Sequence, residues 1–179
     1  YLIMSDALSN CWGSQNDLMM SKRLLSRLDD RKAYIKKIDI FGIELYCVTV
    51  IYFKKSMFSK FLFSTVKHIQ ENYQYYRELY YFQNNMFRND NAFSIAIHML
   101  NGFTNETSVV GELPITGLMM SWDVNDIHNI NGINDISLLV EKEGQKGSYL
   151  LSRIKNQDIH ILNKWSINRF SDRLIEIYE

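Results

Sequence analysis

The sequence is poor in the residues that mark several common classes of protein. One proline and two cysteines, Cys11 and Cys47, occur among 179 residues. The cysteines have no metal-binding spacing and form no evident disulfide framework, which is typical of a reducing compartment such as the cytoplasm. No apolar run reaches the roughly 18 residues that a membrane-spanning helix needs. We therefore expect a cytoplasmic protein without a membrane span.

A net charge and the common catalytic signatures are also missing. The 20 basic and 20 acidic side chains cancel, so we expect no nucleic-acid binding, which depends on a basic surface. There is no glycine-rich phosphate loop, no nucleophile elbow and no zinc-type cluster of cysteine and histidine. Of the four histidines, His68 and His98 fall within expected helices, where packing or surface roles are the simplest interpretation.

Apolar and aromatic side chains are abundant. Hydrophobic residues make up 46% and aromatic residues 13% of the sequence, enough for the core of one α/β domain over residues 1–179. The chain begins with Tyr1 in an apolar stretch, not with methionine. We interpret it as a fragment of a longer chain.

Apolar patterns predict strands and helices in alternation. Residues 44–53, ELYCVTVIYF, are rich in β-branched and aromatic side chains and predict a central strand. The other expected β elements are strands at 1–4, 113–122 and 158–162 and a hairpin of 136–142 with 148–154, and 123–134 is expected to be a long turn. Helices are expected from Ser56 or Ser59, over 73–82, from Ser14 with Leu18, Leu24, Leu25 and Leu28 buried, and from Ser166 with Ile167, Phe170, Leu174, Ile175 and Tyr178 buried.

The stretch FRNDNAFSIAIHMLNG, residues 87–102, is the most informative part of the sequence. Apolar residues at helical spacing predict a buried helix that Asn89 or Asp90 caps and Gly102 ends. Arg88, Asn89 and Asp90 then lie together at its start. An arginine, an amide and a carboxylate grouped there suit recognition of a polyhydroxyl compound or a phosphate. A capping box with an ion pair explains the same residues, and the spacing leaves both interpretations open.

A second polar group follows the expected strand at 158–162. His160 precedes Lys164 by four residues, and Trp165 comes next. A neutral imidazole can ligate a metal, and a lysine ammonium can hold a phosphate. Such a pair at a strand end would suit a diphosphate–metal site, although its spacing alone does not decide this.

Several of these stretches together resemble a known family. ELYCVTVIYF with Lys-Lys-Ser, the phenylalanine-rich helix after it, FRNDNAFSIAIHMLNG and the late HILNKW are similar to the C-terminal portion of GT-A-type glycosyltransferases. The resemblance is to phage and bacterial glycosyltransferase-like proteins and, more remotely, to glycosyltransferase family 8. It implies a GT-A-like mixed sheet flanked by helices, lacking part of the N-terminal nucleotide-binding half. The implied activity is transfer of a sugar from a nucleotide-sugar to an unknown acceptor.

The resemblance also implies roles for particular residues. His160 would ligate a divalent metal, Mn²⁺ or Mg²⁺, while Lys164 would contact phosphate with Trp165 beside it. Asp90, helped by Arg88, would face the sugar or the acceptor as the catalytic group, and the neighbouring Asn89 would contact substrate.

The sequence departs from the family pattern in ways that support a second hypothesis. The glycine and proline of the late motif are absent, and Asn163 stands before the lysine. No Asp-X-Asp metal motif occurs, and the nearest acidic candidates, Asp6 and the pair Asp123 and Asp126, do not fit it. The alternative is therefore a non-catalytic structural or protein-interaction module on a degenerate fold of this type, which for a viral protein would act in the host cytoplasm. The oligomeric state stays open.

Overall fold

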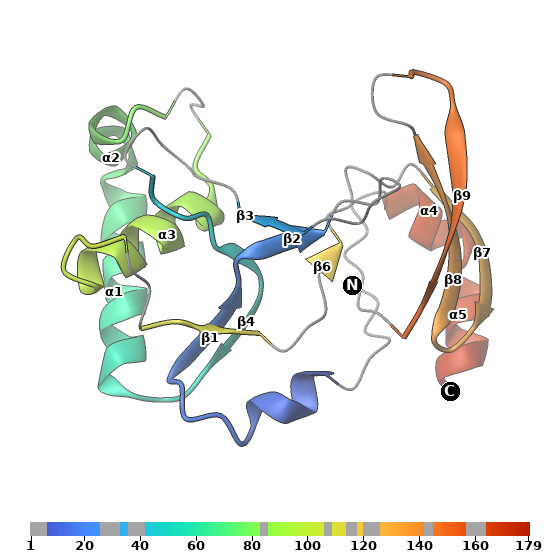
Figure 1. Ribbon diagram of the computed structural model, residues 1–179, viewed down its shortest axis with the longest axis horizontal. Helices are drawn as coiled ribbons and strands as arrows, with labels where there is room; N and C mark the ends of the chain where they lie inside the picture. The colour runs from blue at the N-terminus through green and yellow to red at the C-terminus, as the bar shows by residue number, and fades with distance from the viewer. Residues whose placement is uncertain are drawn as a thin grey trace. The chain divides into compact units, whose positions relative to one another are not determined.

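The structure is a computed structural model that describes residues 7–25, 33–35, 42–82, 86–105, 109–113, 118–119, 126–141, 145–156 and 164–179. It is mixed α/β, with small sheets and helices (Figure 1), which confirms the expected class. The chain divides into two compact units. Unit 1 comprises residues 1–9, 24–34 and 115–179, and unit 2 comprises 10–23 and 35–114. The single domain expected over 1–179 stays a prediction.

Unit 2 is built on a small sheet in the order β4-β1-β5. The central strand β1 (Leu18–Ser21) pairs antiparallel with β4 (Cys47–Phe53) and parallel with β5 (Gly111–Glu112). All four residues of β1 are buried. The strand predicted at 44–53 is therefore present as β4, but in the described part of the chain β1 takes the central place that we expected for it.

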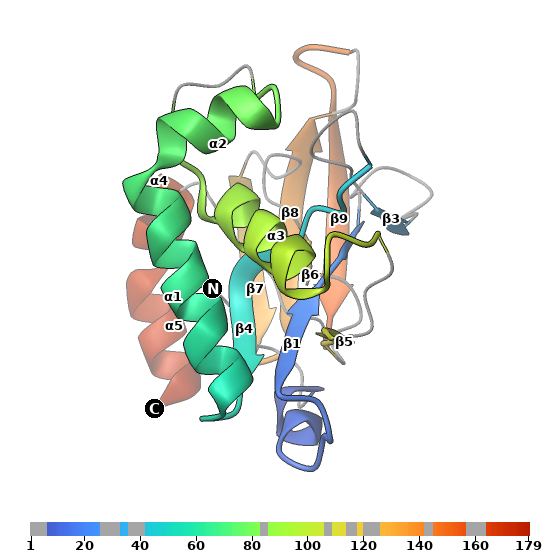
Figure 2. The same ribbon diagram turned by 90° about the vertical axis from the view of Figure 1, so that its left-hand side faces the viewer.

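In the described part of unit 2, the sheet is accompanied by three helices (Figure 2): α1 (Met57–Glu71), α2 (Tyr73–Leu79) and α3 (Asn89–Leu100). The Oγ of Ser56 accepts a hydrogen bond from the N–H of Ser59 at 3.3 Å and caps α1, as one of the two predicted starts requires. Helices α1 and α3 pack against each other and against β1 and β4. Their shared core contains Leu18, Met20, Leu62, Ile69, Ala92, Ile95, Ala96 and Ile97, all with side chains at most 1% exposed.

The two ends of α3 differ in how well the sequence predicts them. Arg88 is the N-cap residue, and Asn89 and Asp90 lie inside the first turn, so the prediction that one of them caps the helix is wrong. At the other end Gly102 stops the helix as predicted, with a φ of +69°. The N–H of Gly102 donates to Met99 and that of Phe103 to His98, which is a Schellman motif.

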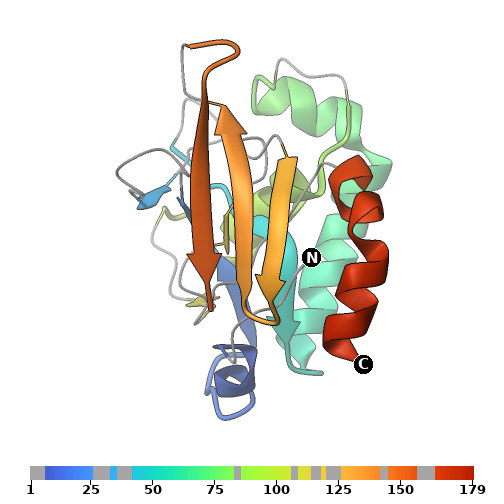
Figure 3. The same cartoon turned by 90° about the vertical axis from the view of Figure 1, so that its right-hand side faces the viewer.

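The described part of unit 1 is mostly an antiparallel meander (Figure 3) of β7 (Asp126–Gly132), β8 (Asp135–Glu141) and β9 (Tyr149–Lys155). Helices α4 (Lys164–Arg169) and α5 (Ser171–Tyr178) cover one face of it. The apolar core between sheet and helices contains Ile127, Ile130, Ile136, Leu138, Val140, Ile154, Ile167, Phe170, Leu174 and Ile177. The pairing of β8 with β9 confirms the predicted hairpin.

A short 3₁₀ helix, η1 (Ala7–Cys11), precedes these elements. A further small sheet has the strand order β3-β2-β6. Its strands are β2 (Arg23–Leu25), β3 (Ala33–Ile35) and β6 (Leu118–Met119). Within the described residues, no helix has the length and apolar character needed to span a bilayer.

Several predicted elements are wrong. The helix expected from Ser14 is replaced by β1 and β2, and residues 126–132 of the expected long turn form β7. Ser166 lies inside α4 and does not start it, while Ile175 and Tyr178 of α5 are exposed. The strands expected at 1–4 and 158–162, together with Asp6 and Asp123, lie outside the described residues.

Candidate functional site

The first half of α3 is joined to the start of β4 by hydrogen bonds that are buried or partly buried. The Oγ of Ser94 accepts the N–H of Tyr46 at 2.9 Å and donates to the carbonyl of Asp90 at 2.7 Å. The carboxylate of Asp90 accepts the N–H of Val48 at 3.1 Å. Asp90 and Ser94 therefore fix the backbone of residues 46–48 where β4 begins.

The predicted group at the start of α3 is only partly assembled. Arg88 Nη2 lies 3.3 Å from Asp90 Oδ2, and the two side chains are 48% and 21% exposed. The side chain of Asn89 is exposed on the same turn. Because Asp90 already accepts hydrogen bonds from Val48 and Arg88, the geometry gives it a positioning role. Its predicted catalytic role stays a prediction.

A pocket lies toward the other end of α3. It is a shallow, partly open hollow lined by Ile43, Glu44, Tyr46, Ser94, Ile97, His98, Asn101, Thr104 and Asn105. Its inner space is about 10 Å³, room for about one water molecule. The hollow therefore accepts one polar group from the edge of a ligand, such as a hydroxyl, and does not enclose a whole sugar ring or nucleotide-sugar.

His98 is the pocket residue with the clearest chemical role. Its Nδ1 lies 3.1 Å from the carbonyl oxygen of Thr104. A carbonyl can only accept, so Nδ1 carries the proton and Nε2 of the neutral ring has a lone pair. The ring of Phe103 packs edge-on against the imidazole, with 5.6 Å between centroids. The imidazole is thus held by the turn that ends α3.

That turn is itself tightly bonded. Asn101 Nδ2 donates to Thr104 Oγ1 at 2.7 Å, and this hydroxyl donates to the carbonyl of Asn101 at 3.0 Å. Phe103 has a φ of +62°, an uncommon backbone conformation for a bulky residue. Residues held in such conformations cluster at functional sites, which supports a function for the pocket beside it.

One residue that lines the pocket, Glu44, belongs to a largely buried ion pair. Lys22 Nζ lies 3.4 Å from Glu44 Oε2, with the two side chains 18% and 17% exposed. The same ammonium lies 5.8 Å from the centre of the Tyr46 ring. Lys22 thus balances the carboxylate of Glu44. The pocket combines carboxylate, imidazole, amide and hydroxyl groups against two isoleucines, which suits a ligand rich in hydroxyls.

Sequence reasoning missed this pocket. Arg88, Asn89 and Asp90 do not line it, whereas His98, which we interpreted as a packing or surface residue, does. The sequence carries only part of the signal. A helix that ends at Asn101-Gly102 brings His98, one turn earlier, beside the loop that contains Thr104, but nothing in the sequence places residues 43–46 there.

Most of the predicted metal-binding and phosphate-binding side chains lie outside the described part of the structure. His160 lies outside the described residues, as does the side chain of Lys164, whose backbone begins α4. Trp165 is on α4 and is 81% exposed. Within the described ranges, no three or more histidine, cysteine, aspartate or glutamate side chains are grouped to hold a metal. The divalent metal stays a prediction.

The two cysteines are not suited to nucleophilic chemistry. Cys11 and Cys47 are both buried. Burial raises the pKa of both thiols, which keeps them protonated at neutral pH and therefore unreactive.

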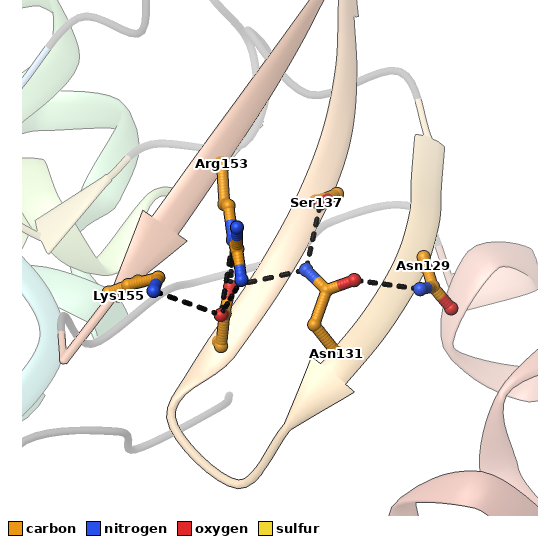
Figure 4. Close-up of polar contacts among 6 residues, drawn as sticks. Asn129, Asn131, Ser137, Arg153 and Lys155 are labelled. Atoms are coloured by element: carbon orange, nitrogen blue, oxygen red, sulfur yellow. Dashed lines mark hydrogen bonds and ion pairs between the residues drawn. The ribbon is translucent and has the colours of Figure 1, made fainter.

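A second polar group crosses the meander of unit 1 (Figure 4). Asp135 Oδ1 accepts from Arg153 Nε at 2.7 Å and from Asn131 Nδ2 at 3.1 Å, and Lys155 Nζ lies 3.5 Å from Oδ2. The hydrogen bonds from Arg153 hold the pKa of the Asp135 carboxyl well below its usual range. Asn131 also donates to Ser137 at 2.9 Å. These contacts link all three strands, so we interpret the group as a lock on the strand register.

A similar lock joins α4 to the meander. Ser166 is buried, accepts the N–H of Ile127 at 3.2 Å and donates to the carboxylate of Asp126. Arg169 pairs with the same carboxylate, and its hydrogen bond is the main reason that the pKa of Asp126 is lowered. Asp126, considered above as an acidic metal candidate, is therefore occupied by its own helix.

Comparison with known proteins adds no assignment: no family model, curated protein or solved structure matches the chain.

Proposed function

We propose that the chain is a glycosyltransferase, or part of one, that transfers a sugar from a nucleotide-sugar to an acceptor hydroxyl. One observation carries the proposal. The two stretches that resemble the glycosyltransferases, 44–53 and 87–102, are hydrogen-bonded to each other through Ser94 and Asp90. A pocket lined by hydroxyl, amide, carboxylate and imidazole groups lies where they meet.

In this proposal the hydroxyl edge of one sugar ring binds over the pocket. Nε2 of His98 accepts a hydrogen bond from a ring hydroxyl, and Glu44, paired with Lys22, accepts another. In the reaction, the bond between the anomeric carbon and the diphosphate oxygen breaks. The acceptor oxygen bonds to that carbon and gives up its proton, and the nucleoside diphosphate leaves. A divalent cation at His160 would offset the charge of the leaving diphosphate.

The test is the melting temperature of the full-length protein with UDP-glucose, UDP-galactose, UDP-N-acetylglucosamine and the corresponding GDP-sugars, with and without Mn²⁺. A ligand at 100 times its Kd stabilises the folded state by about 2.7 kcal/mol. For a chain of this size that is a rise of about 5–10 °C. A rise with one nucleotide-sugar supports the proposal, and no rise with any of them contradicts it.

Two histidine variants make the test specific to the pocket. His98→Ala should reduce the ligand-induced rise because it removes Nε2. His68→Ala is the matched control, since His68 is exposed on α1 and bonded to Asn72, outside the pocket. If both variants respond like the wild type, the sugar is not bound by His98.

The second candidate function is the interaction module, and a separate observation favours it. Helices α1 and α2 expose large apolar side chains, including Met57, Phe61, Tyr75 and Leu79. Exposed apolar side chains that gather into a patch mark interaction surfaces. Absence of any nucleotide-dependent melting shift would favour this function over transfer.

A further inference from the structure

An exposed tryptophan, Trp12, lies in the tight turn between η1 and β1. The N–H of Ser14 donates to the carbonyl of Cys11 at 3.1 Å, which makes Trp12 and Gly13 the central residues of the turn. Cys11 is buried, whereas Trp12 is 81% exposed. A single exposed apolar residue is common on protein surfaces, so what matters is how firmly the turn holds the ring.

The turn is fixed to both neighbouring strands. After β4, Lys54 Nζ donates to the carbonyl of Ser14 at 2.5 Å and its N–H donates to that of Asp17 at 2.8 Å. Asn16 donates to Ser14 Oγ at 3.1 Å. Its side chain also packs on Gly111 of β5, where an added Cβ would lie 2.4 Å from Asn16 Nδ2. These contacts hold the backbone that presents Trp12 to solvent.

A second aromatic ring orients the indole. Trp12 and Tyr52 meet edge to face, with 6.1 Å between centroids and 88° between planes. Tyr52 and Phe53 are successive residues of β4 and so point to opposite faces of the sheet. Phe53 contacts Phe63 of α1. Trp12 and Tyr52 therefore lie on the face of β4 that is turned away from α1.

Gly13 is not fixed by the fold. Its φ is outside the left-handed region, so the backbone conformation does not require glycine. A Cβ at this position would meet no atom within 4 Å beyond its chain neighbours. Gly13 therefore adds no contact that would hold the indole, and Tyr52 is the ring that orients it.

We propose that Trp12, with Tyr52 beside it, is a stacking platform for a pyranose sugar. One face of a pyranose ring carries C–H groups that pack on an aromatic face, and the hydroxyls at its edge bond to polar neighbours. Polar residues follow directly in the sequence as Ser14, whose hydroxyl accepts from Asn16, and Gln15. A second copy of the chain is the competing occupant, and the experiment below distinguishes it from a sugar. The inference goes beyond the pocket and holds whether or not the chain transfers the sugar.

The experiment follows the indole N–H signals of the ¹⁵N-labelled full-length protein by NMR. Trp12→Phe identifies the Trp12 signal. Glucose, galactose, mannose and N-acetylglucosamine are added separately up to about 100 mM, with sorbitol as the open-chain control and UMP as a planar base. We expect at least one pyranose to move the Trp12 signal in a saturable way, and sorbitol and UMP to leave it in place.

Variants then test the platform. Trp12→Ala should weaken binding of the active sugar by about 2- to 10-fold or abolish it, the size expected for loss of one aromatic contact. Tyr75→Ala, which removes another exposed ring, on α2, should bind as the wild type does.

Three results would overturn the platform. The first is a Trp12 signal that no pyranose moves, and the second is a signal that sorbitol or UMP moves as strongly. The third is dimerisation in sedimentation that Trp12→Ala abolishes, because a second copy would then cover the ring. A sugar response without any nucleotide-sugar melting shift would support the platform and contradict only the proposed transfer.

Discussion

At the scale of single residues, the hydroxyl of Ser94 connects the two stretches that form the pocket. It is buried and is the acceptor for the N–H of Tyr46. We expect Ser94→Ala to lower the free energy of unfolding by about 1–3 kcal/mol, because a buried N–H would lose its partner. Urea unfolding measures this. Ser64→Ala, at an exposed position of α1, should change stability by no more than about 0.5 kcal/mol.

Two substitutions of Asp90 separate the effect of its charge from the effect of its hydrogen bond to Val48. Asp90→Asn keeps an oxygen that can accept the N–H of Val48 and loses only the partly exposed pair with Arg88, so stability should change by at most about 1 kcal/mol. Asp90→Ala loses the acceptor and should unfold more easily by about 1–3 kcal/mol. Urea unfolding of both variants checks this. Equal losses for the two would show that charge, and not the hydrogen bond to Val48, is what matters.

Asp135 predicts a pH dependence of stability. Arg153 holds the pKa of this carboxyl below its usual range, so the unfolded chain binds more protons than the folded one at acid pH. The stability from this group is then fully present above an ordinary aspartate pKa of about 3.9 and is lost as the pH falls below it. Urea midpoints from pH 7 to 2 should fall less steeply for Asp135→Asn. Asp172→Asn, an exposed carboxyl on α5, should leave the wild-type slope nearly unchanged.

At the scale of elements, the same substitution at Gly102 and at Gly132 tests what the end of α3 requires. A Cβ would meet nothing within 4 Å at either position, but only Gly102 has a positive φ, +69°. We expect Gly102→Ala to lower the free energy of unfolding by about 1–2 kcal/mol because alanine is strained in this conformation. Gly132→Ala should be nearly neutral. If thermal unfolding of the two variants were the same, the Schellman motif would not depend on glycine.

The elements that the sequence predicts correctly share a clear local pattern. Helix α1 has helical apolar spacing and a serine cap, and α3 adds a glycine stop. Strand β1 lies where the sequence predicts a helix from Ser14 and the spacing of its leucines, whereas the structure buries all four residues of the strand. A strand covered on both faces shows no alternation of polar and apolar residues, so its type depends on pairing with distant β4 and β5.

Strand β7 was mistaken for a turn for a different reason. Its pairing with β8 slips between Ile127 and Asn129 and again between Ile130 and Gly132. These irregularities put its two buried isoleucines three residues apart, so the period of two is lost. Asparagine and glycine then suggest a turn, and only the contacts with β8 and α4 make the segment a strand.

One part of the candidate site could also be predicted from the sequence, and another part could not. The polar start of α3 could be predicted because Arg88, Asn89 and Asp90 are adjacent in sequence. The pocket could not, because residues 43–46 and the turn at 102–105 meet only when the strand and the helix pack. His98 faces that pocket through a backbone motif and a bond to Thr104, which helical spacing alone does not reveal.

At the scale of the whole molecule, the chain passes from one unit to the other and back more than once. We therefore expect one cooperative transition in calorimetry, because neither unit can unfold without disturbing segments that lead into the other. Leu62→Ala in α1 and Leu138→Ala in β8 each empty a fully buried position, one in each unit. Both should lower the same transition, each by about 2–5 kcal/mol. Two transitions, each moved by one variant only, would contradict the prediction of a single domain.

The interleaving of the units also has a consequence for synthesis on the ribosome. Unit 2 uses no residue beyond 114, whereas unit 1 combines its early segments with residues 115–179. At about 5–20 residues per second, unit 2 has all its segments several seconds before unit 1 does. Residues 1–9 and 24–34 are therefore synthesised several seconds before their partners in unit 1. During that time unit 2, which contains the pocket and the Trp12 turn, can already fold.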